Sequence, residues 1–295
     1  MRHFHNVRRR IAGLAFSADG KTLMACVRGG MKVAAWNCAT GEFRYWKVVA
    51  DAPVRSLAFS PDGNWFAVGD ELGMTFVHRY PSLDSEHEFS PGGFWDPNWV
   101  TGIAFGWTAD RSDCRIAMAA GKLCIAEMAN DKADGPLSDG EGYSAVAFSP
   151  DGQFLAALNL GEFGVQVWNA WTRKPAGDVA FKQEPRSVCF TADGRGLAVA
   201  IASRVELLDV AELNPRHTCA HGARVTQVAA HPARNVVASA GTDGTVRFWN
   251  ADRGKEEKAY NWNIGRVTAV AFAPDGLTCA AGGEKGQVVV WDVDA

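Results

Sequence analysis

Three residues of the types used by hydrolases follow one another closely in the last third of the chain. They are His221, Ser239 and Asp243. In hydrolases with a Ser-His-Asp triad, the serine attacks the substrate carbonyl, the histidine takes the serine proton and the carboxylate orients the histidine. A triad is recognised by geometry and not by residue types. Whether these three side chains act in catalysis or have a structural role therefore depends on where the fold places them.

Other reactive residue types give weaker signals. His3 and His5 are two metal ligands at most, too few for zinc, and we interpret them as part of a strand face. Cys38 and Cys219 have no obvious basic neighbour to activate them, so we assign them no reactivity. The seven cysteines include no Cys-x-x-Cys pair, which favours free thiols in the reducing cytoplasm over a disulfide framework.

A repeated segment organises the chain that carries these residues. Residues 11–20 recur at 54–63, 143–152, 185–194 and 267–276, with weaker copies at 100–109 and 225–234. One position recurs at spacings of 40 to 46 residues, which is the length of a four-stranded propeller blade. The residues at this position are Phe16, Phe59, Phe105, Phe148, Phe190, Ala230 and Phe272.

Each copy predicts the same series of strands. Alternating residues followed by Ser-Pro-Asp-Gly or a variant predict a half-buried strand and a tight turn. A short apolar strand, a turn with Gly, a third strand and a more polar fourth segment follow. We therefore expect an all-β fold, a single seven-bladed β-propeller of four-stranded antiparallel blades. The third strands should end at Trp36, His78, Ala126, Trp168, Leu208, Trp249 and Trp291.

The predicted propeller occupies residues 1–295 as one domain. Its approximate repeats are 8–50, 51–96, 97–139, 140–182, 183–221, 222–263 and 264–295 plus 1–7. The 23 residues after Phe272 and the first 16 residues together make one repeat. We expect residues 2–7 to form the outer strand of the last blade, which closes the ring without an unpaired terminal edge.

The third-strand ends resemble the Trp-Asp signature of WD-repeat propellers. Segments 33–37, 165–169, 246–250 and 288–292 end in tryptophan followed by Asn or Asp. The sixth repeat is the closest match, although its His221-Gly222 reverses the family's Gly-His order. The resemblance implies a buried relay from the Trp249 indole to Ser239, His221 and Asp243, which we favour over a catalytic triad. Repeats two, three and five depart from the pattern, with His78, Ala126 and Leu208 in place of the tryptophan.

The first strands line the central channel, where propeller enzymes usually work. None of the predicted first strands contains Asp or Glu, although Asp70, Glu71 and Glu162 could contribute from the rim. Hydrolysis and calcium binding usually need such groups. We therefore expect no catalytic residue, no cofactor and no metal. The alternative is a propeller enzyme resembling lactone hydrolases with a site built at the rim, which a bound metal in elemental analysis would favour.

One predicted loop is rich in large aromatic residues. Phe94, Trp95 and Trp99 lie among Gly and Pro between the second and third repeats. Its position on the face where the first strands begin is typical of an interface anchor. The alternative is that Trp95 and Trp99 plug the channel mouth or pack on a neighbouring blade.

Arginines recur at the same rim. Their planar fork suits carboxylate or phosphate recognition. The alternative is that nearby acidic residues (Asp51, Glu141, Glu184 and Glu284) pair with them. The candidate partner-binding arginines are Arg55, Arg186, Arg224 and Arg266.

Composition narrows the class of partner. The net charge is −3 and no basic stripe occurs, which disfavours nucleic acid. No run of about 18 apolar residues occurs, so we expect no membrane span. We expect a monomeric cytoplasmic protein that acts as a non-catalytic scaffold and presents a loop face to a protein or peptide partner of unknown identity.

Overall fold

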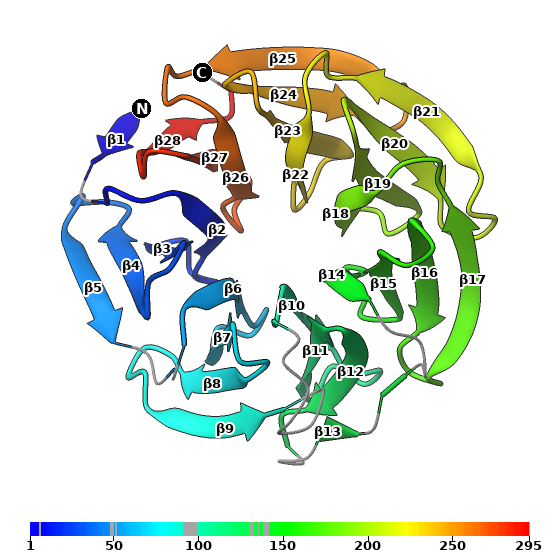
Figure 1. The fold of residues 1–295 in the computed structure, drawn as a ribbon, viewed down its shortest axis with the longest axis horizontal. Helices are drawn as coiled ribbons and strands as arrows, with labels where there is room; N and C mark the ends of the chain where they lie inside the picture. Colours follow the sequence, from blue (N-terminus) through cyan, green and yellow to red (C-terminus); the bar gives the residue numbers. More distant parts are fainter. Residues whose placement is uncertain are drawn as a thin grey trace.

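Seven four-stranded antiparallel sheets form a ring in the computed structural model (Figure 1). The structure describes residues 1–5, 7–47, 50, 52–90, 99–129, 133–134, 136–137 and 142–294, and these residues contain no helix. Six of the sheets are built in chain order from the centre outward. The predicted all-β, seven-bladed propeller is confirmed.

The first four blades follow the chain directly. The first contains β2 (Ile11–Phe16), β3 (Thr22–Val27), β4 (Lys32–Asn37) and β5 (Phe43–Lys47). The second contains β6 (Val54–Phe59), β7 (Trp65–Asp70), β8 (Thr75–Arg79) and β9 (Ser85–Phe89). The third contains β10 (Gly102–Trp107), β11 (Cys114–Ala120), β12 (Lys122–Glu127) and β13 (Ala133–Asp134). The fourth contains β14 (Tyr143–Phe148), β15 (Phe154–Asn159), β16 (Gly164–Asn169) and β17 (Lys174–Ala180).

The last three blades complete the ring. The fifth contains β18 (Pro185–Phe190), β19 (Gly196–Ile201), β20 (Arg204–Asp209) and β21 (Pro215–Ala220). The sixth contains β22 (Val225–Ala230), β23 (Val236–Gly241), β24 (Thr245–Asn250) and β25 (Lys255–Asn261). The seventh joins β26 (Val267–Phe272), β27 (Thr278–Gly283) and β28 (Val288–Asp292) to β1 (Arg2–Phe4).

The N-terminal strand closes the seventh blade, as predicted. β1 pairs antiparallel with β28, and Arg2 lies opposite Val290. Phe4 is only 5% exposed, and its ring stacks on that of Trp36 in the first blade at 5.5 Å between centroids. β1 ends at Phe4 and not at residue 7, because Val7 is buried in the cluster between the first and seventh blades.

The apolar core is a series of layers between neighbouring blades. One cluster packs Met24 and Val33 of the first blade against Phe66 and Phe76 of the second. The middle strands are almost entirely buried, and all six residues of β19 are buried. Because each layer ties two blades together, the ring holds the first strands and their loops in fixed positions.

A polar turn follows most of the first strands and sets their register. In the first blade, the Ser17 hydroxyl donates to Asp19 (2.6 Å), and Gly20 has a positive φ of 68°. In the third blade, Thr108 and Asp110 make the same contact (2.8 Å). The recurring position there is therefore Trp107 at the end of β10, and the predicted Phe105 is wrong by two residues. The turn determines the register, and two extra residues precede it in this repeat.

The loops that enter the first strands share one face with the hairpins between second and third strands. Backbone hydrogen bonds join the two kinds of loop, such as Val54 N–H to the Gly30 carbonyl (2.9 Å) and Glu284 N–H to the Arg266 carbonyl (3.0 Å). We call this the entry face. Its described residues are 5, 7–10, 28–31, 50, 52–53, 71–74, 99–101, 121, 142, 160–163, 181–184, 202–203, 221–224, 242–244, 262–266 and 284–287.

Candidate functional site

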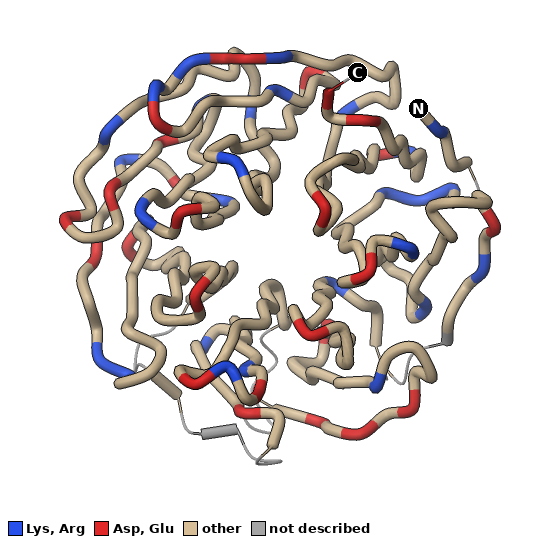
Figure 2. The backbone as a smooth tube through the Cα atoms, turned by 180° about the vertical axis from the view of Figure 1, so that it is seen from behind, with Lys and Arg blue, Asp and Glu red and all other residues tan. Residues whose placement is uncertain are grey.

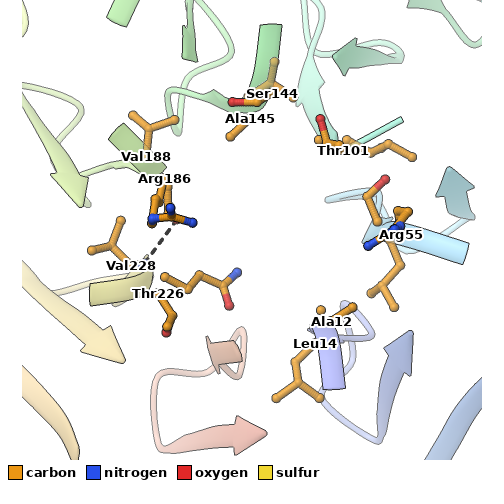
Figure 3. Close-up of a pocket in the computed structure, with 18 of the residues that line it drawn as sticks. Ala12, Leu14, Arg55, Thr101, Ser144, Ala145, Arg186, Val188, Thr226 and Val228 are labelled. Atoms are coloured by element: carbon orange, nitrogen blue, oxygen red, sulfur yellow. Dashed lines mark hydrogen bonds between the residues drawn. The ribbon is translucent and has the colours of Figure 1, made fainter. Parts of the chain in front are cut away.

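A cavity of about 240 Å³ lies in the central channel where the first strands begin (Figure 3). Its walls are residues at or near the start of the seven first strands, such as Ala12 in β2, Ser144 in β14 and Thr226 in β22. None of the residues that line it is Asp, Glu, His or Cys. The cavity therefore offers hydroxyl, backbone and apolar groups together with two cations.

The two cations are Arg55 of β6 and Arg186 of β18, which lie on opposite sides of the cavity (Figure 3). Arg55 is held in place from two sides. Its Nε lies 2.6 Å from Glu71 Oε1, and its Cζ lies 4.1 Å from the ring centroid of Trp99. Ion pairing and cation–π attraction together orient the guanidinium.

A further arginine interacts electrostatically with both cavity cations. The pKa of Arg10 lies below its ordinary value, because burial disfavours the charged form and Arg28, Arg186 and Arg55 repel it, against attraction by Glu284. Positive charge therefore outweighs negative charge around this guanidinium.

The other candidate arginines, including the second cavity cation Arg186, have acidic neighbours or lie at other hollows. Arg186 Nη2 lies 3.7 Å from Glu184 Oε2, and Arg266 Nε lies 3.9 Å from Glu284 Oε2. Arg224 is exposed beside another hollow of the entry face. Of the predicted acidic neighbours, Asp51 and Glu141 lie outside the described residues.

Large apolar side chains are exposed on the entry face. Met31 (49% exposed), Leu72 (57%), Trp99 (48%) and Phe163 (44%) belong to it, whereas Leu277 is on the opposite face. Phe94 and Trp95 lie outside the described residues. Sequence reasoning missed Met31, Leu72 and Phe163. Their signal is an apolar residue at a hairpin tip, where polar turn residues are usual.

The four residues of the predicted relay meet in the sixth blade. The Trp249 indole N–H donates to Ser239 Oγ (2.7 Å), which lies 2.8 Å from His221 Nδ1. His221 Nε2 lies 3.4 Å from Asp243 Oδ1 and only 3.1 Å from Thr245 Oγ1. Because Thr245 donates to Asp243 (2.8 Å), its hydroxyl bridges the ring to the carboxylate, a role that sequence reasoning missed.

Protonation follows from this arrangement. Burial lowers the pKa of His221, although the Asp243 carboxylate opposes the effect. Burial works against ionisation of Asp243 too, but hydrogen bonds from Thr245 and His221 hold the pKa of this carboxyl below its ordinary value. The His221 ring is therefore neutral. Ser239 donates to its Nδ1, and its Nε2–H points to Thr245 and Asp243, so that every polar group of the relay has a hydrogen-bond partner. Ser239 and His221 are fully buried, so a substrate has no access to them.

Comparison with known proteins agrees with this geometry. The sequence pattern of the family described as "WD domain, G-beta repeat" matches residues 47–76, 213–250 and 258–292. The second match contains all four relay residues. The predicted resemblance to WD-repeat proteins is thus confirmed for these three stretches of the chain.

Several relatives share parts of this WD-repeat chain. The serine-threonine kinase receptor-associated protein of Bos taurus is 24% identical over 147 residues, which cover 50% of this chain and 41% of the relative. The small ribosomal subunit protein RACK1 of Caenorhabditis elegans is 37% identical over 59 residues, 20% of this chain and 18% of the relative. A WD repeat-containing protein of Synechocystis sp. is 28% identical over 141 residues, 45% of this chain and 39% of the relative. The matches thus span between 18% and 41% of the length of these relatives.

The WD repeats differ in how their third strands are anchored. Trp168 and Trp291 keep the tryptophan, yet their indole N–H groups have no hydrogen-bond partner among the described residues. In the second blade, His78 occupies the position and is fully buried. Neither of its ring nitrogens makes a well-formed hydrogen bond within the described part of the chain.

Replacing His78 with leucine should stabilise the chain by about 1–2 kcal/mol, since a buried polar group without a partner is costly. Burial lowers the pKa of His78 below 6.5, against a weaker effect of the Leu83 backbone. The unfolded state therefore takes up the proton first, and stability falls as the pH drops below about 6.5 toward the folded-state pKa. Urea unfolding at pH 7.5 and 5.5 measures this loss.

His78→Leu should show a smaller loss between the two pH values than the wild type. Some loss should remain, because burial also lowers the pKa values of His221 and His231. An equal loss in both proteins would show that His78 does not titrate in this window.

The other residues with catalytic or metal-binding potential lie apart. Asp70 is buried and accepts the N–H groups of Leu72 and Met74 (2.9 Å each), while Glu162 is exposed. The rings of His3 and His5 stack at 5.9 Å. In the residues that the structure covers, no three His, Cys, Asp or Glu side chains gather as metal ligands.

Burial keeps the thiols protonated. None of the seven cysteines, all of which the structure describes, forms a disulfide bond. Burial raises the pKa of Cys38 to about 11 and that of Cys219 to about 11. The protonated thiol is a weak nucleophile. A search of the described residues also finds no helix with the length and apolarity needed to cross a membrane.

Proposed function

We propose that the chain is a non-catalytic interaction scaffold that binds a protein or peptide partner on its entry face. The observation that carries this proposal is the set of half-exposed apolar side chains (Met31, Leu72, Trp99 and Phe163) on the face where the arginine-lined cavity lies. These side chains come from loops of four successive blades, and large apolar side chains exposed on one face are typical of interaction surfaces. Arginine and aromatic residues are also enriched at the centres of interfaces.

The enzyme alternative has less support. The cavity of 240 Å³ is smaller than ordinary small-molecule pockets, which measure about 300–1,000 Å³. No side chain that lines it can act as a general base at neutral pH. The name of one relative records association with a kinase receptor, which agrees with a binding role.

We further propose that the chain works as a cytoplasmic monomer without nucleic acid or membrane. Lys and Arg are interspersed with Asp and Glu around most of the ring, and no continuous basic stretch runs along it (Figure 2). Nucleic-acid binding usually needs a continuous basic stripe.

Trp99→Ala combined with Phe163→Ala tests the proposal. Both side chains are about half exposed, so the melting temperature should change little. Loss of central aromatic anchors typically weakens an interface by about 2 kcal/mol or more each. Wild-type and variant chains, immobilised at equal density, are compared by quantitative mass spectrometry of proteins captured from the native host.

The matched control replaces Tyr45 and Leu277, which are exposed on the rim and on the opposite face. Proteins captured by the wild type and the control should be lost from the entry-face variant. Equal capture by all three chains would refute the entry face as the partner surface. Trp95, predicted from sequence to join this surface, can be added as a third substitution.

A further inference from the structure

We propose that the cavity at the entry-face end of the channel receives an anionic side chain of a peptide partner. The side chain would be Glu, Asp or a phosphorylated residue, which all present negatively charged oxygens. This inference rests on the proposed function and adds the chemistry of the partner. Its basis is the arrangement of donors around the cavity.

Two cations and two hydroxyl groups are the donors that line the cavity and matter for this inference. Arg55 and Arg186 lie on opposite sides, and Thr101 and Ser144 lie on the wall between them (Figure 3). Neither hydroxyl makes a hydrogen bond to a described residue. By contrast, other hydroxyls of the lining are used within the fold, as when Thr226 donates to the Val267 carbonyl (2.8 Å). Hydroxyl donors next to guanidinium groups with unused N–H groups form an anion site.

The first cation is already oriented. Glu71 lies against Nε of Arg55, and Trp99 covers the guanidinium plane. The terminal nitrogens Nη1 and Nη2 donate to no residue in the described part of the chain. Because little freedom remains to be lost on binding, this arginine is preorganised for a carboxylate or phosphate.

The second cation is loosely held. Arg186 is 3.7 Å from Glu184, beyond hydrogen-bonding distance, and can turn toward a ligand. Apolar residues such as Leu14, Ile103 and Val188 also line the cavity and reduce screening by water. Burial is the main cause that lowers the pKa of Arg10, and the additional repulsion by Arg28, Arg186 and Arg55 agrees with positive charge at this end of the channel.

The size of the cavity favours a side chain over a larger ligand. At 240 Å³ it lies below the range of drug-sized pockets, about 300–1,000 Å³. The exposed Trp99 continues this site onto the surface, where it can pack against the flanking part of the peptide. A peptide is therefore a better match than a free metabolite.

Fluorescence anisotropy with three labelled peptides tests the inference. The peptides share one Gly-Ser sequence with a central pair of Glu, phosphoserine or Gln residues. The Glu or phosphoserine peptide should bind at least about tenfold more tightly than the Gln peptide, and binding should weaken as salt rises. Arg55→Gln and Arg186→Gln should each weaken binding about tenfold, since each removes charge-assisted hydrogen bonds.

Arg79→Gln is the matched control. Arg79 pairs with Glu86 (2.7 Å) and its Cζ lies 4.7 Å from the Trp65 ring centroid, so its surroundings are like those of Arg55. It lies at the opposite end of the second blade, away from the cavity. It should leave peptide affinity unchanged. Equal affinity for all three peptides, no binding up to millimolar concentration, or full binding by Arg186→Gln overturns the inference.

Two further comparisons identify the ligand and separate the proposals. Tighter binding of the phosphoserine peptide than of the Glu peptide would assign a phosphorylated partner. Tighter binding of the Glu peptide would assign a partner with Glu or Asp at this position. Competition with inorganic phosphate is compared with competition by unlabelled peptide. If phosphate displaces the labelled peptide at the same concentration as unlabelled peptide does, the peptide assignment is overturned. If the arginine variants still capture the partners that Trp99→Ala with Phe163→Ala loses, the anion inference fails and the proposed function stands.

Discussion

Deletion of residues 1–8 should lower the melting temperature by about 10 °C or cause aggregation, because burying a Phe side chain alone is worth about 3–5 kcal/mol. The deletion removes Phe4 from the ring of Trp36 and Val7 from the cluster between the first and seventh blades. It also leaves β28 as an unpaired edge, and such edges pair with other chains. Differential scanning calorimetry and light scattering measure the two effects.

Two controls separate the causes. Removal of Met1 alone, which is 66% exposed, should change nothing. Phe4→Ala should reproduce most of the thermal loss without the aggregation, since the β1–β28 pairing remains. If the truncated chain melts with the full chain and stays monomeric, closure by β1 contributes nothing to stability.

Asp243→Ala should destabilise the chain by about 1–3 kcal/mol, which is the cost of leaving a buried polar group without its partner. The substitution removes the acceptor of Thr245 and, through it, of the buried His221 ring. Because the pKa of Asp243 is lowered in the fold, its contribution is complete above its ordinary pKa of 3.8 and is lost as the pH falls through the lower folded value. Denaturant unfolding at pH 7 and pH 3 checks both statements.

Asp275→Ala is the control for this prediction. Asp275 lies in an exposed turn of the neighbouring blade and accepts the N–H of Leu277 (2.9 Å), whereas the buried His231 ring beside this turn bonds to the Gly276 carbonyl (3.1 Å). Asp275→Ala should lower the free energy of unfolding by much less than Asp243→Ala does. Asp243→Asn should keep part of the relay, because the amide oxygen can still accept a hydrogen bond. Equal effects of the two alanine substitutions would argue that the relay adds no stability beyond an ordinary turn.

The sequence repeat made the propeller architecture predictable. Prediction failed for side chains whose positions depend on contacts with a neighbouring blade. The period gave seven blades and the closure by β1, because each blade repeats one pattern of strands and turns. The register failed at Phe105, where extra residues precede the turn at Thr108. Arg55 with Glu71 and Trp99 could not be inferred from spacing, since the entry loop of the third blade carries Trp99 to an arginine of the second.

The relay shows a second limit. His221, Ser239, Asp243 and Trp249 follow from the family's spacing, but Thr245 does not, because its part depends on a side-chain orientation that only the folded hairpin sets. The exposed apolar tips at Met31, Leu72 and Phe163 are individually ordinary. Only the ring brings them to one face with the arginine cavity.

The pairing of β1 with β28 also determines how the ring responds to force. Both chain ends lie at the seventh blade (Figure 1), and Arg2 faces Val290 near the two ends. A load applied between the termini therefore separates the paired residues one at a time, from Arg2 toward Phe4, and never shears the ladder as a whole. Once these three pairs are lost, the first and seventh blades are still joined by the apolar layer between them and by the Thr268 hydroxyl, which donates to the Ile11 carbonyl (2.7 Å), so the ring loses its closing strand before its core is pulled apart.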